Sequence, residues 1–359
     1  MEQPIYSVVQ VTDQLNVGGA EQIIVMLANL LQQHGHYSAV ITTVAPGKLS
    51  QKLHPSVEHI NLRRKWKWNP LTMYRLVKVL KGFDIAHVHS AYNLRYVYLV
   101  SRLFFLRKTI FYHEHYGNAV NTKPDFFQKR IYRQTIFIAV SQKLAEWANN
   151  TVGLKNSQVF ILPNTIVKNK ITPAFQPTDQ FKLCIVGNIL VNKNILFALE
   201  LLTFLRQKKQ SVHLTIIGNI VDKEYYKQLL NFIKQTNLQS NVCFIHDCLD
   251  VQASLHLFKA AIHCSLSESG PLVLIEYLAQ GLPFVAYNTG EVATRLQSYL
   301  PAFIMNDFNV EKWIEAIEQA TTLPKKEIET RFDLLYQKYF SPENYYLECI
   351  SIYNKGLLF

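Results

Sequence analysis

The 359-residue sequence has few cysteines and no pattern that would link them. Its five cysteines are scattered, without a Cys-x-x-Cys pair or a dense framework. This spacing excludes a small disulfide-stapled secreted domain and favours a reducing compartment. Residues Met1 to Tyr6 also lack the basic start and apolar core of a secretory signal peptide. We therefore expect a cytoplasmic protein.

Long hydrophobic runs and acidic residues are scarce as well. No apolar run reaches the roughly 18 residues that a membrane-spanning helix needs, because Arg102 interrupts the best candidate. The chain has 26 acidic residues against 37 basic ones, a formal net charge of +11. This excess of positive charge favours an anionic partner. Nucleic acid is not expected, because no recognition motif accompanies the charge.

Much of the positive charge lies in segments that also carry aromatic residues. One such segment consists of Arg63, Arg64, Lys65, Trp66, Lys67 and Trp68, and residues 102–108 repeat the pattern. Basic side chains attract anionic headgroups and tryptophan favours the interface. The pattern predicts peripheral binding to an anionic membrane surface, on the inner face of the cell membrane. The alternative is a solvated basic face whose tryptophans pack locally.

An apolar content of 49% and a charged content of 18% are typical of a folded protein. Strand-like and helical segments alternate along the chain, which predicts an α/β protein with two parallel sheets. The first set of predicted strands is 5–11, 38–44, 85–89, 109–113, 136–140 and 159–162. The second set is 181–186, 212–217, 242–245, 261–265, 284–286 and 302–305.

The chain is long for one core and suits two Rossmann-like domains facing a central cleft. We place the boundary within residues 164–178, where Pro163, Pro173 and Pro177 punctuate a polar run. The predicted domains are 1–167, which would bind the acceptor, and 168–341, which would bind a nucleotide sugar. Residues 342–359 would form a helix that packs back on the first domain.

Two carboxylates flank a predicted helix start in residues 267–285, Ser-Glu-Ser-Gly-Pro-Leu-Val-Leu-Ile-Glu-Tyr-Leu-Ala-Gln-Gly-Leu-Pro-Phe-Val. Glu268 precedes the helix and Glu276 lies inside it. Gly270 can serve as the N-cap, and Pro271 suits the first helical position. The free amides from about Leu272 onward would then favour a phosphate or another anion. An amphipathic helix with one exposed glutamate is the structural alternative.

This segment resembles the E-x7-E motif of retaining GT-B glycosyltransferases of the family 4 type, also called glycosyl transferases group 1. The resemblance covers both acids, the Gly-Pro pair and the closing Gly-x-Pro. It implies that Glu276 binds the ribose of a sugar nucleotide and that Glu268 lies beside the transferred sugar. The resemblance also implies that the donor is bound along Ser269, Gly270, Pro271 and Leu272, where the helix amides support sugar and diphosphate.

A glycine turn and a lysine follow the first strand of the second half. Gly187, Asn188 and Lys193 supply a turn, a polar side chain and a cation before a helix, which predicts a diphosphate cradle. The element resembles the family's G-R-L-x-x-x-K-G, with Asn188 in the place of arginine. Asparagine brings no charge, so Asn188 is either a weak ligand contact or a turn residue. The alternative for Lys193 is an ordinary solvated lysine without a ligand.

In the first half, Gly18 and Gly19 resemble the family's glycine pair, where backbone lies close to donor phosphate and acceptor. His113 and His115 follow a later strand, and the resemblance assigns one of them to the donor sugar. We favour His115 and place His113 in the acceptor and phosphate loop. With His87 and His89 these residues could ligate a metal. We expect no metal, since the family works without a catalytic one and the sequence contains no Asp-x-Asp element.

These features predict a metal-independent hexosyltransferase that moves a sugar with retention to a lipid-linked or polysaccharide acceptor in cell-surface glycan synthesis. A UDP- or GDP-sugar would be the donor, as a substrate, and no cofactor is expected. The predicted catalytic residues are Glu268, His115 and Lys193. The alternatives are a non-catalytic scaffold of the same fold, which Asn188 keeps open, and a sugar-nucleotide epimerase.

Overall fold

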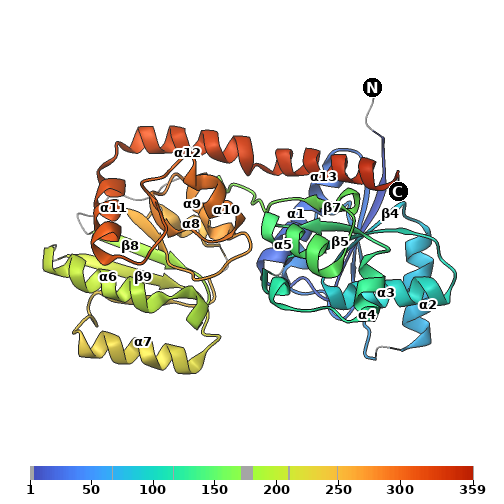
Figure 1. Cartoon of the computed structure of the whole chain (residues 1–359), viewed down its shortest axis with the longest axis horizontal. Coiled ribbons are helices and arrows are strands. Elements are labelled where there is room, and N and C mark those ends of the chain that lie inside the picture. Colours follow the sequence, from blue (N-terminus) through green and yellow to red (C-terminus); the bar gives the residue numbers. More distant parts are fainter. Residues whose placement is uncertain are drawn as a thin grey trace. The chain divides into compact units, whose positions relative to one another are not determined.

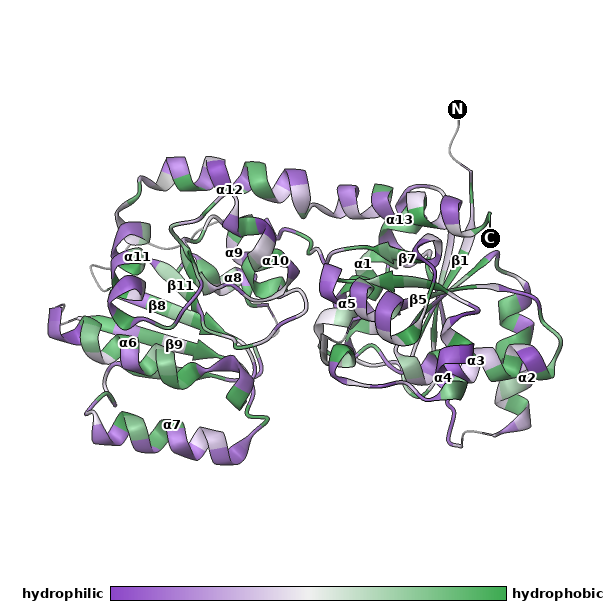
Figure 2. Ribbon diagram, in the orientation of Figure 1, coloured by the Kyte–Doolittle hydropathy of each residue, from purple (hydrophilic) through white to green (hydrophobic). Residues whose placement is uncertain are grey.

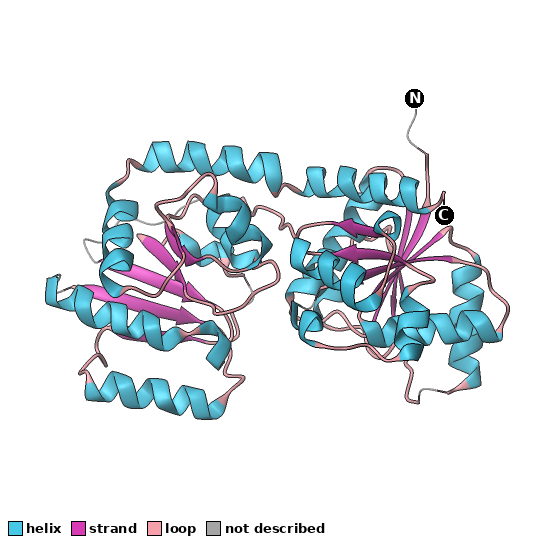
Figure 3. Cartoon of the chain, in the orientation of Figure 1, coloured by secondary structure: helices cyan, strands magenta, loops and turns pink. Residues whose placement is uncertain are grey.

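The computed structural model describes residues 4–66, 68–115, 117–170, 181–208, 211–248 and 250–358. Lys67 of the basic segment and Pro173 and Pro177 of the predicted boundary lie outside the described residues. The chain forms two compact units, Met1–Val167 with Ser341–Phe359, and Lys168–Phe340. Each unit contains one fully parallel sheet with helices around it (Figure 3). The predicted α/β class is confirmed.

The first unit is built on a seven-stranded sheet of order β3-β2-β1-β4-β5-β6-β7. Its order reverses between β1 and β4, which are neighbours in the sheet although two strands separate them in the chain. The strands are β1 (Ser7–Thr12), β2 (Tyr37–Thr42), β3 (Glu58–Asn61), β4 (Ile85–His89), β5 (Thr109–Glu114), β6 (Ile136–Ala139) and β7 (Val159–Ile161).

Helices cover both faces of this sheet (Figure 1). Alternate residues of a strand point to opposite faces. In β2, Val40 packs in a cluster with α1, whereas Ala39 and Ile41 pack in the larger cluster with α2, α3 and α5. The helices are α1 (Gly19–Gln33), α2 (Pro70–Lys81), α3 (Ala91–Leu103), α4 (Phe126–Tyr132), α5 (Gln142–Trp147) and α13 (Pro342–Gly356).

The last helix, α13, packs against the rest of the first unit through aromatic side chains. The hydroxyl of Tyr346 lies 2.8 Å from Nε2 of His36, and that of Tyr353 lies 2.7 Å from Nδ1 of His87. A Cβ atom added at Gly356 would lie 2.5 Å from the ring of Phe111. The helix can approach β5 this closely because position 356 has no side chain.

The second unit has a six-stranded sheet of order β10-β9-β8-β11-β12-β13, which reverses between β8 and β11. Its strands are β8 (Phe181–Val186), β9 (Val212–Ile217), β10 (Val242–Ile245), β11 (Ala260–His263), β12 (Phe284–Tyr287) and β13 (Ile304–Met305). In Figure 2 these strands are mostly hydrophobic, as expected for a parallel sheet covered on both faces.

Helices α6 and α7 lie on one face of the second sheet, and α8, α9 and α10 lie on the other (Figure 1). Helix α12 packs on α9. The helices are α6 (Ile195–Lys208), α7 (Lys223–Gln235), α8 (Gln252–Leu255), α9 (Leu272–Ala279), α10 (Gly290–Gln297), α11 (Val310–Thr322) and α12 (Lys325–Tyr339).

We predict that Gly356→Ala lowers the free energy of unfolding by roughly 1–2 kcal/mol, because overpacking against Phe111 outweighs the better helix propensity of alanine. Urea titration of the purified protein measures the change. Gly82→Ala is the matched control, since an added Cβ there would meet only ordinary contacts. Equal stability of the two variants would refute the tight approach of α13 to β5.

Candidate functional site

The predicted donor-binding residues of the second unit gather at one edge of its sheet. Of these residues, Gly187 and Lys193 follow β8, and the predicted catalytic residue Glu268 follows β11; Gly290, which was not predicted to bind the donor, follows β12. Strands β8, β11 and β12 are adjacent and parallel, so the loops after them meet at the carboxyl edge. The strand order reverses between β8 and β11, and ligands of open α/β sheets bind at such a reversal.

Lys193 and Glu268 form an ion pair across this reversal. Lys193 Nζ contacts Glu268 Oε1, and the side chains are 22% and 16% exposed. Burial alone would raise the pKa of Glu268. The charge of Lys193, with hydrogen bonds from Lys193 and Ser265, outweighs burial and holds this pKa below its usual range. Glu268 is therefore an anion at neutral pH.

The turn that carries Lys193, Val191–Lys193, is tied to the Glu268 loop by two hydrogen bonds. Asn192 Nδ2 donates to the carbonyl of Ser267 at 2.7 Å, and its own carbonyl accepts from Leu266 N at 2.8 Å. The stem of Lys193 passes over Gly187, where an added Cβ would lie 3.2 Å from Cε. Lys193 is therefore held beside Glu268 by its turn as well as by charge.

The loop after β12 supports Glu268 from the other side. Thr289 Oγ1 lies 3.1 Å from the backbone N of Glu268, and Glu291 N donates to the carbonyl of Ser269 at 2.8 Å. Gly290 has φ 79°, and an added Cβ would lie 2.9 Å from Pro271 and 3.0 Å from Glu268. Glycine is required here both for the positive φ and for the close approach.

Helix α9 begins one residue later than the sequence predicted. Its N-cap is Pro271, with extended ψ of 109°, and its first residue is Leu272. The prediction that Gly270 is the N-cap is therefore wrong, and Gly270 lies in the preceding loop with Ser269. Pro271 has no N–H, so the first free amides of the helix still begin at Leu272. Ser269, Gly270 and Pro271 separate them from Glu268 in the chain.

Glu276 lies in α9 and has a raised pKa. Burial, followed by the negative charge of Asp250, raises the pKa of Glu276 to about 7. Asn169 Nδ2 donates to both carboxylate oxygens of Asp250, at 2.9 and 3.0 Å. Asp250 is thereby held where its negative charge acts on Glu276.

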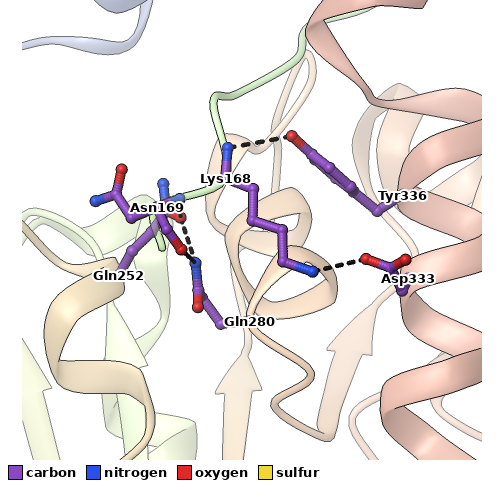
Figure 4. A network of polar contacts seen from close by, with 6 residues as sticks. All are labelled: Lys168, Asn169, Gln252, Gln280, Asp333 and Tyr336. Carbon is purple, nitrogen blue, oxygen red and sulfur yellow. Dashed lines mark hydrogen bonds and ion pairs between the residues drawn. The ribbon is translucent and has the colours of Figure 1, made fainter. Parts of the chain in front are cut away.

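A polar network holds the first residues of the second unit in place (Figure 4). Gln252 Oε1 accepts from Asn169 N at 3.0 Å and from Gln280 Nε2 at 2.6 Å. Lys168 pairs with Asp333 at 2.6 Å, and its backbone N donates to Tyr336 at 3.1 Å. Residues 168 and 169 are therefore joined to α8, α12 and the end of α9.

Asn188, which stands where the family has arginine, is exposed. Its Oδ1 lies 3.3 Å from the backbone N of Asn219 in the loop after β9. This contact is the one expected of a turn residue.

Two polar residues near this edge were missed by the sequence analysis. His263 ends β11 and lies 3.8 Å from Glu268 Oε1, and the charge of Asp250 adds to the effect of burial on the pKa of Glu276. The signal for His263 was its place at the end of the apolar run Ala260 to Ile262. No signal in the sequence indicated Asp250.

In the first unit, Gly18 caps α1 and Gly19 is its first residue, after β1. His89 ends β4, the neighbour of β1, and His115 follows β5. These positions lie around the reversal of the first sheet. Burial lowers the pKa of His115 to about 3, so it is neutral at physiological pH and offers a hydrogen bond but no charge.

The prediction that His113 lines the acceptor and phosphate loop is wrong. Its side chain is 0% exposed, because it lies within β5 and not after it, and its Nδ1 lies 3.2 Å from Nε2 of His87. His115 stacks on His113 at 4.0 Å between centroids and is partly exposed. Of the two, only His115 has a side chain that is partly exposed.

His87, His89 and His113 bring ring nitrogens within 4.8 Å of one another, as in a site that could hold a metal ion. Their rings are stacked, however, at 18° between His87 and His113 and 20° between His87 and His89. In-plane lone pairs of stacked rings do not converge on one point. His89 also has Gln10 at 2.6 Å and His115 at 2.9 Å, so the cluster is a hydrogen-bonded stack.

The basic segment is divided between surface and interior. Trp66 and Trp68 are 69% and 57% exposed, whereas Arg64 is only 5% exposed. The Arg64 guanidinium lies over the rings of Tyr92 and Tyr96, at 4.8 and 4.2 Å. The prediction that Arg64 belongs to a membrane-binding surface is therefore wrong, since this side chain anchors the segment to α3.

Exposed apolar residues continue from the tryptophans into the first turns of α2. Leu71 and Tyr74 are 67% and 58% exposed. We call Arg63, Lys65, Trp66, Trp68, Leu71 and Tyr74 the aromatic-basic patch. Among the described residues, no helix has the length and hydrophobicity needed to cross a membrane.

Chemically, the edge of the second sheet offers a cation, an anion and free helix amides within one loop cluster. Such an arrangement suits a ligand that combines a phosphate group with hydroxyls: Lys193 and the amides of α9 attract phosphate, and carboxylates accept hydrogen bonds from hydroxyls.

Two known protein families match the chain, one in each unit. Residues 167–333 match the family described as glycosyl transferases group 1. Residues 17–169 match the family described as Glycosyltransferase Family 4. The two matches fall on different units, and the first contains Lys193, Glu268 and Glu276.

Individual proteins resemble the chain at low identity. Human alpha-1,3/1,6-mannosyltransferase ALG2 is 24% identical over 88% of this chain and 87% of its own length. An uncharacterized glycosyltransferase of Haemophilus influenzae is 27% identical over 58% of this chain and 55% of its own length. The crystal structure of Anabaena HepE in complex with UDP has a TM-score of 0.79 at 16% identity, covering 97% of this chain and 99% of that chain.

Proposed function

Because this chain belongs to the GT-B glycosyltransferases of the family 4 type, we propose that it transfers a sugar, with retention, from a nucleotide sugar to a lipid-linked or polysaccharide acceptor. The two-domain Rossmann-like GT-B fold predicted from the sequence is confirmed by the two parallel sheets and the structural neighbours. The single observation that carries the proposal is the Lys193–Glu268 pair at the sheet reversal, directly before α9.

The donor binds to the second unit. Its diphosphate lies at the first amides of α9 and forms an ion pair with the ammonium of Lys193. The ribose hydroxyls donate hydrogen bonds to Glu276. UDP and UDP-glucose are bound by the structurally similar HepE, which supports a UDP-sugar as the first donor to test. The human relative is a mannosyltransferase by name, which supports a hexose as the transferred sugar.

In the reaction, the bond between the sugar and the diphosphate breaks and negative charge grows on the leaving phosphate. Lys193 and the amides from Leu272 onward stabilise that charge without a metal ion. Glu268 lies on the sugar side and accepts hydrogen bonds from sugar hydroxyls, which fixes the orientation of the anomeric carbon.

The acceptor belongs to cell-surface glycan synthesis, and the protein meets it at the inner face of the membrane. The aromatic-basic patch supports this part of the proposal: it combines exposed tryptophans with Arg63 and Lys65, and a net charge of +11 favours an anionic surface.

Glu268→Ala and Lys193→Ala should each lower transfer at least about tenfold, because each removes a charged contact that strengthens in the transition state. Nucleoside diphosphate release from a panel of UDP-, GDP- and dTDP-sugars, with a membrane lipid extract as acceptor source, measures the rate. Lys208→Ala is the control, since Lys208 forms an exposed pair with Glu318 at 3.6 Å.

Near-normal rates in both site variants, with the control also normal, would refute the site assignment. Nucleotide binding by the wild type without turnover of any donor would instead favour the scaffold hypothesis that the uncharged Asn188 leaves open.

Nucleotide affinity should rise with pH through the pKa of Glu276. The raised pKa of about 7 means that Glu276 is protonated below pH 7 and accepts hydrogen bonds as a carboxylate above it. Kd for UDP or GDP, whichever binds, should fall roughly fivefold between pH 6 and pH 8. Calorimetry measures Kd, and Glu276→Gln should bind weakly with no such pH dependence. An unchanged pH profile in Glu276→Gln would exclude Glu276 as the titrating group.

Replacing Trp66 and Trp68 together with alanine should lower binding to anionic vesicles by roughly tenfold, because two interfacial aromatic rings are lost. Co-sedimentation with vesicles containing phosphatidylglycerol measures binding. Phe204→Ala, a 45% exposed aromatic of α6, is the control. Equal binding by the double variant and the control would refute the aromatic-basic patch as the docking surface.

A further inference from the structure

His263 is a buried histidine without a hydrogen-bond partner among the described residues. It ends β11, is 2% exposed, and neither ring nitrogen has a partner there. Buried polar groups are normally hydrogen-bonded, because an unpaired one loses its contacts with water and gains nothing in return. An unpaired imidazole at this position therefore requires an explanation.

The nearest charged group to this ring is the carboxylate of Glu268. Nε2 of His263 lies 3.8 Å from Oε1 of Glu268, too far for a hydrogen bond. The same oxygen contacts Nζ of Lys193. The lysine and the histidine thus face one carboxylate oxygen, and only the lysine is bonded to it.

We infer that His263 is a positioning residue that holds Glu268 in place when a diphosphate draws Lys193 away. The inference rests on the proposed function, in which Lys193 serves the diphosphate. Once the ammonium turns to phosphate, the 16% exposed carboxylate of Glu268 loses its ionic partner and keeps the hydroxyl of Ser265. A shift of about 1 Å brings Nε2 of His263 within hydrogen-bond range.

The chemistry of His263 suits this role. Burial lowers its pKa to about 4, so the ring is neutral at physiological pH and carries one N–H, which donates from Nε2 in the required tautomer. No proton is transferred in the exchange of partners. Glu268 stays an anion in the same orientation toward the sugar whether or not Lys193 is bound to it.

The test compares His263→Leu, which cannot donate, with His263→Gln, whose amide places a donor near the position of Nε2. His263→Leu should lower kcat about tenfold or more, as expected for a lost hydrogen bond to a charged group, with the KM of the donor nearly unchanged. His263→Gln should restore most of kcat. Cys264→Ala, a change at the next buried residue, is the control and should leave kcat within about twofold, since it removes no donor to Glu268.

Three results would overturn the inference in an active wild type: full kcat in His263→Leu, equal losses in the two His263 variants, or parallel losses of thermal stability and nucleotide affinity. The imidazole ¹⁵N spectrum gives a readout that needs no turnover. Saturating UDP or GDP should shift the His263 Nε2 signal and slow the exchange of its proton. An unchanged signal in the nucleotide-bound protein refutes the inference even if transfer is observed, whereas failure of the proposed function itself appears as a wild type inactive on every donor.

Discussion

The second unit depends on the ion pair between Lys193 and Glu268. Two charged side chains that are mostly removed from water stabilise the fold only when they are paired, so each fixes the position of the other. The surrounding loops are built to keep them together: the turn at Asn192, the threonine before α10 and the glycine at position 290 all contact the Glu268 loop. The same pairing leaves a cation and an anion poised before the first amides of α9, which is the arrangement a sugar nucleotide requires.

The proposed donor chemistry uses this pair twice. When Lys193 is paired with Glu268, the two charges neutralise each other, so both side chains can be largely buried. With Lys193 on a diphosphate, the ligand replaces the carboxylate as the partner of the ammonium, and the carboxylate turns to sugar hydroxyls. Glu276 of α9 shows the opposite balance, since burial, with the negative charge of Asp250 added, raises its pKa.

Most of the fold could be predicted from the sequence, because apolar strands alternate with helices along the whole chain. The strands from β4 onward lie within a few residues of their predicted bounds. Three elements were not predicted, each for a physical reason. Strand β3 is a short, partly exposed edge strand, and α10 is a short helix that begins at a glycine without a side-chain cap. Helix α12 is charged, and its apolar face, which includes Phe332 and Tyr336, is recognisable only from its packing. The one-residue error at Gly270 arose because both Gly270 and Pro271 suit a helix start.

The site residues that follow strand ends could be predicted from the sequence. Residues whose role depends on burial were harder to predict. Glu268 and Lys193 follow adjacent parallel strands, so their approach follows from topology. The burial of Arg64 and His113, and the position of His263 behind Glu268, depend on contacts between distant segments that no local pattern encodes. The most direct measurement is a crystal structure of the protein with a nucleoside diphosphate at the second unit. Our account predicts that Lys193 leaves Glu268 for a phosphate oxygen and that His263 moves onto Glu268. A diphosphate bound with the Lys193–Glu268 pair intact would contradict it.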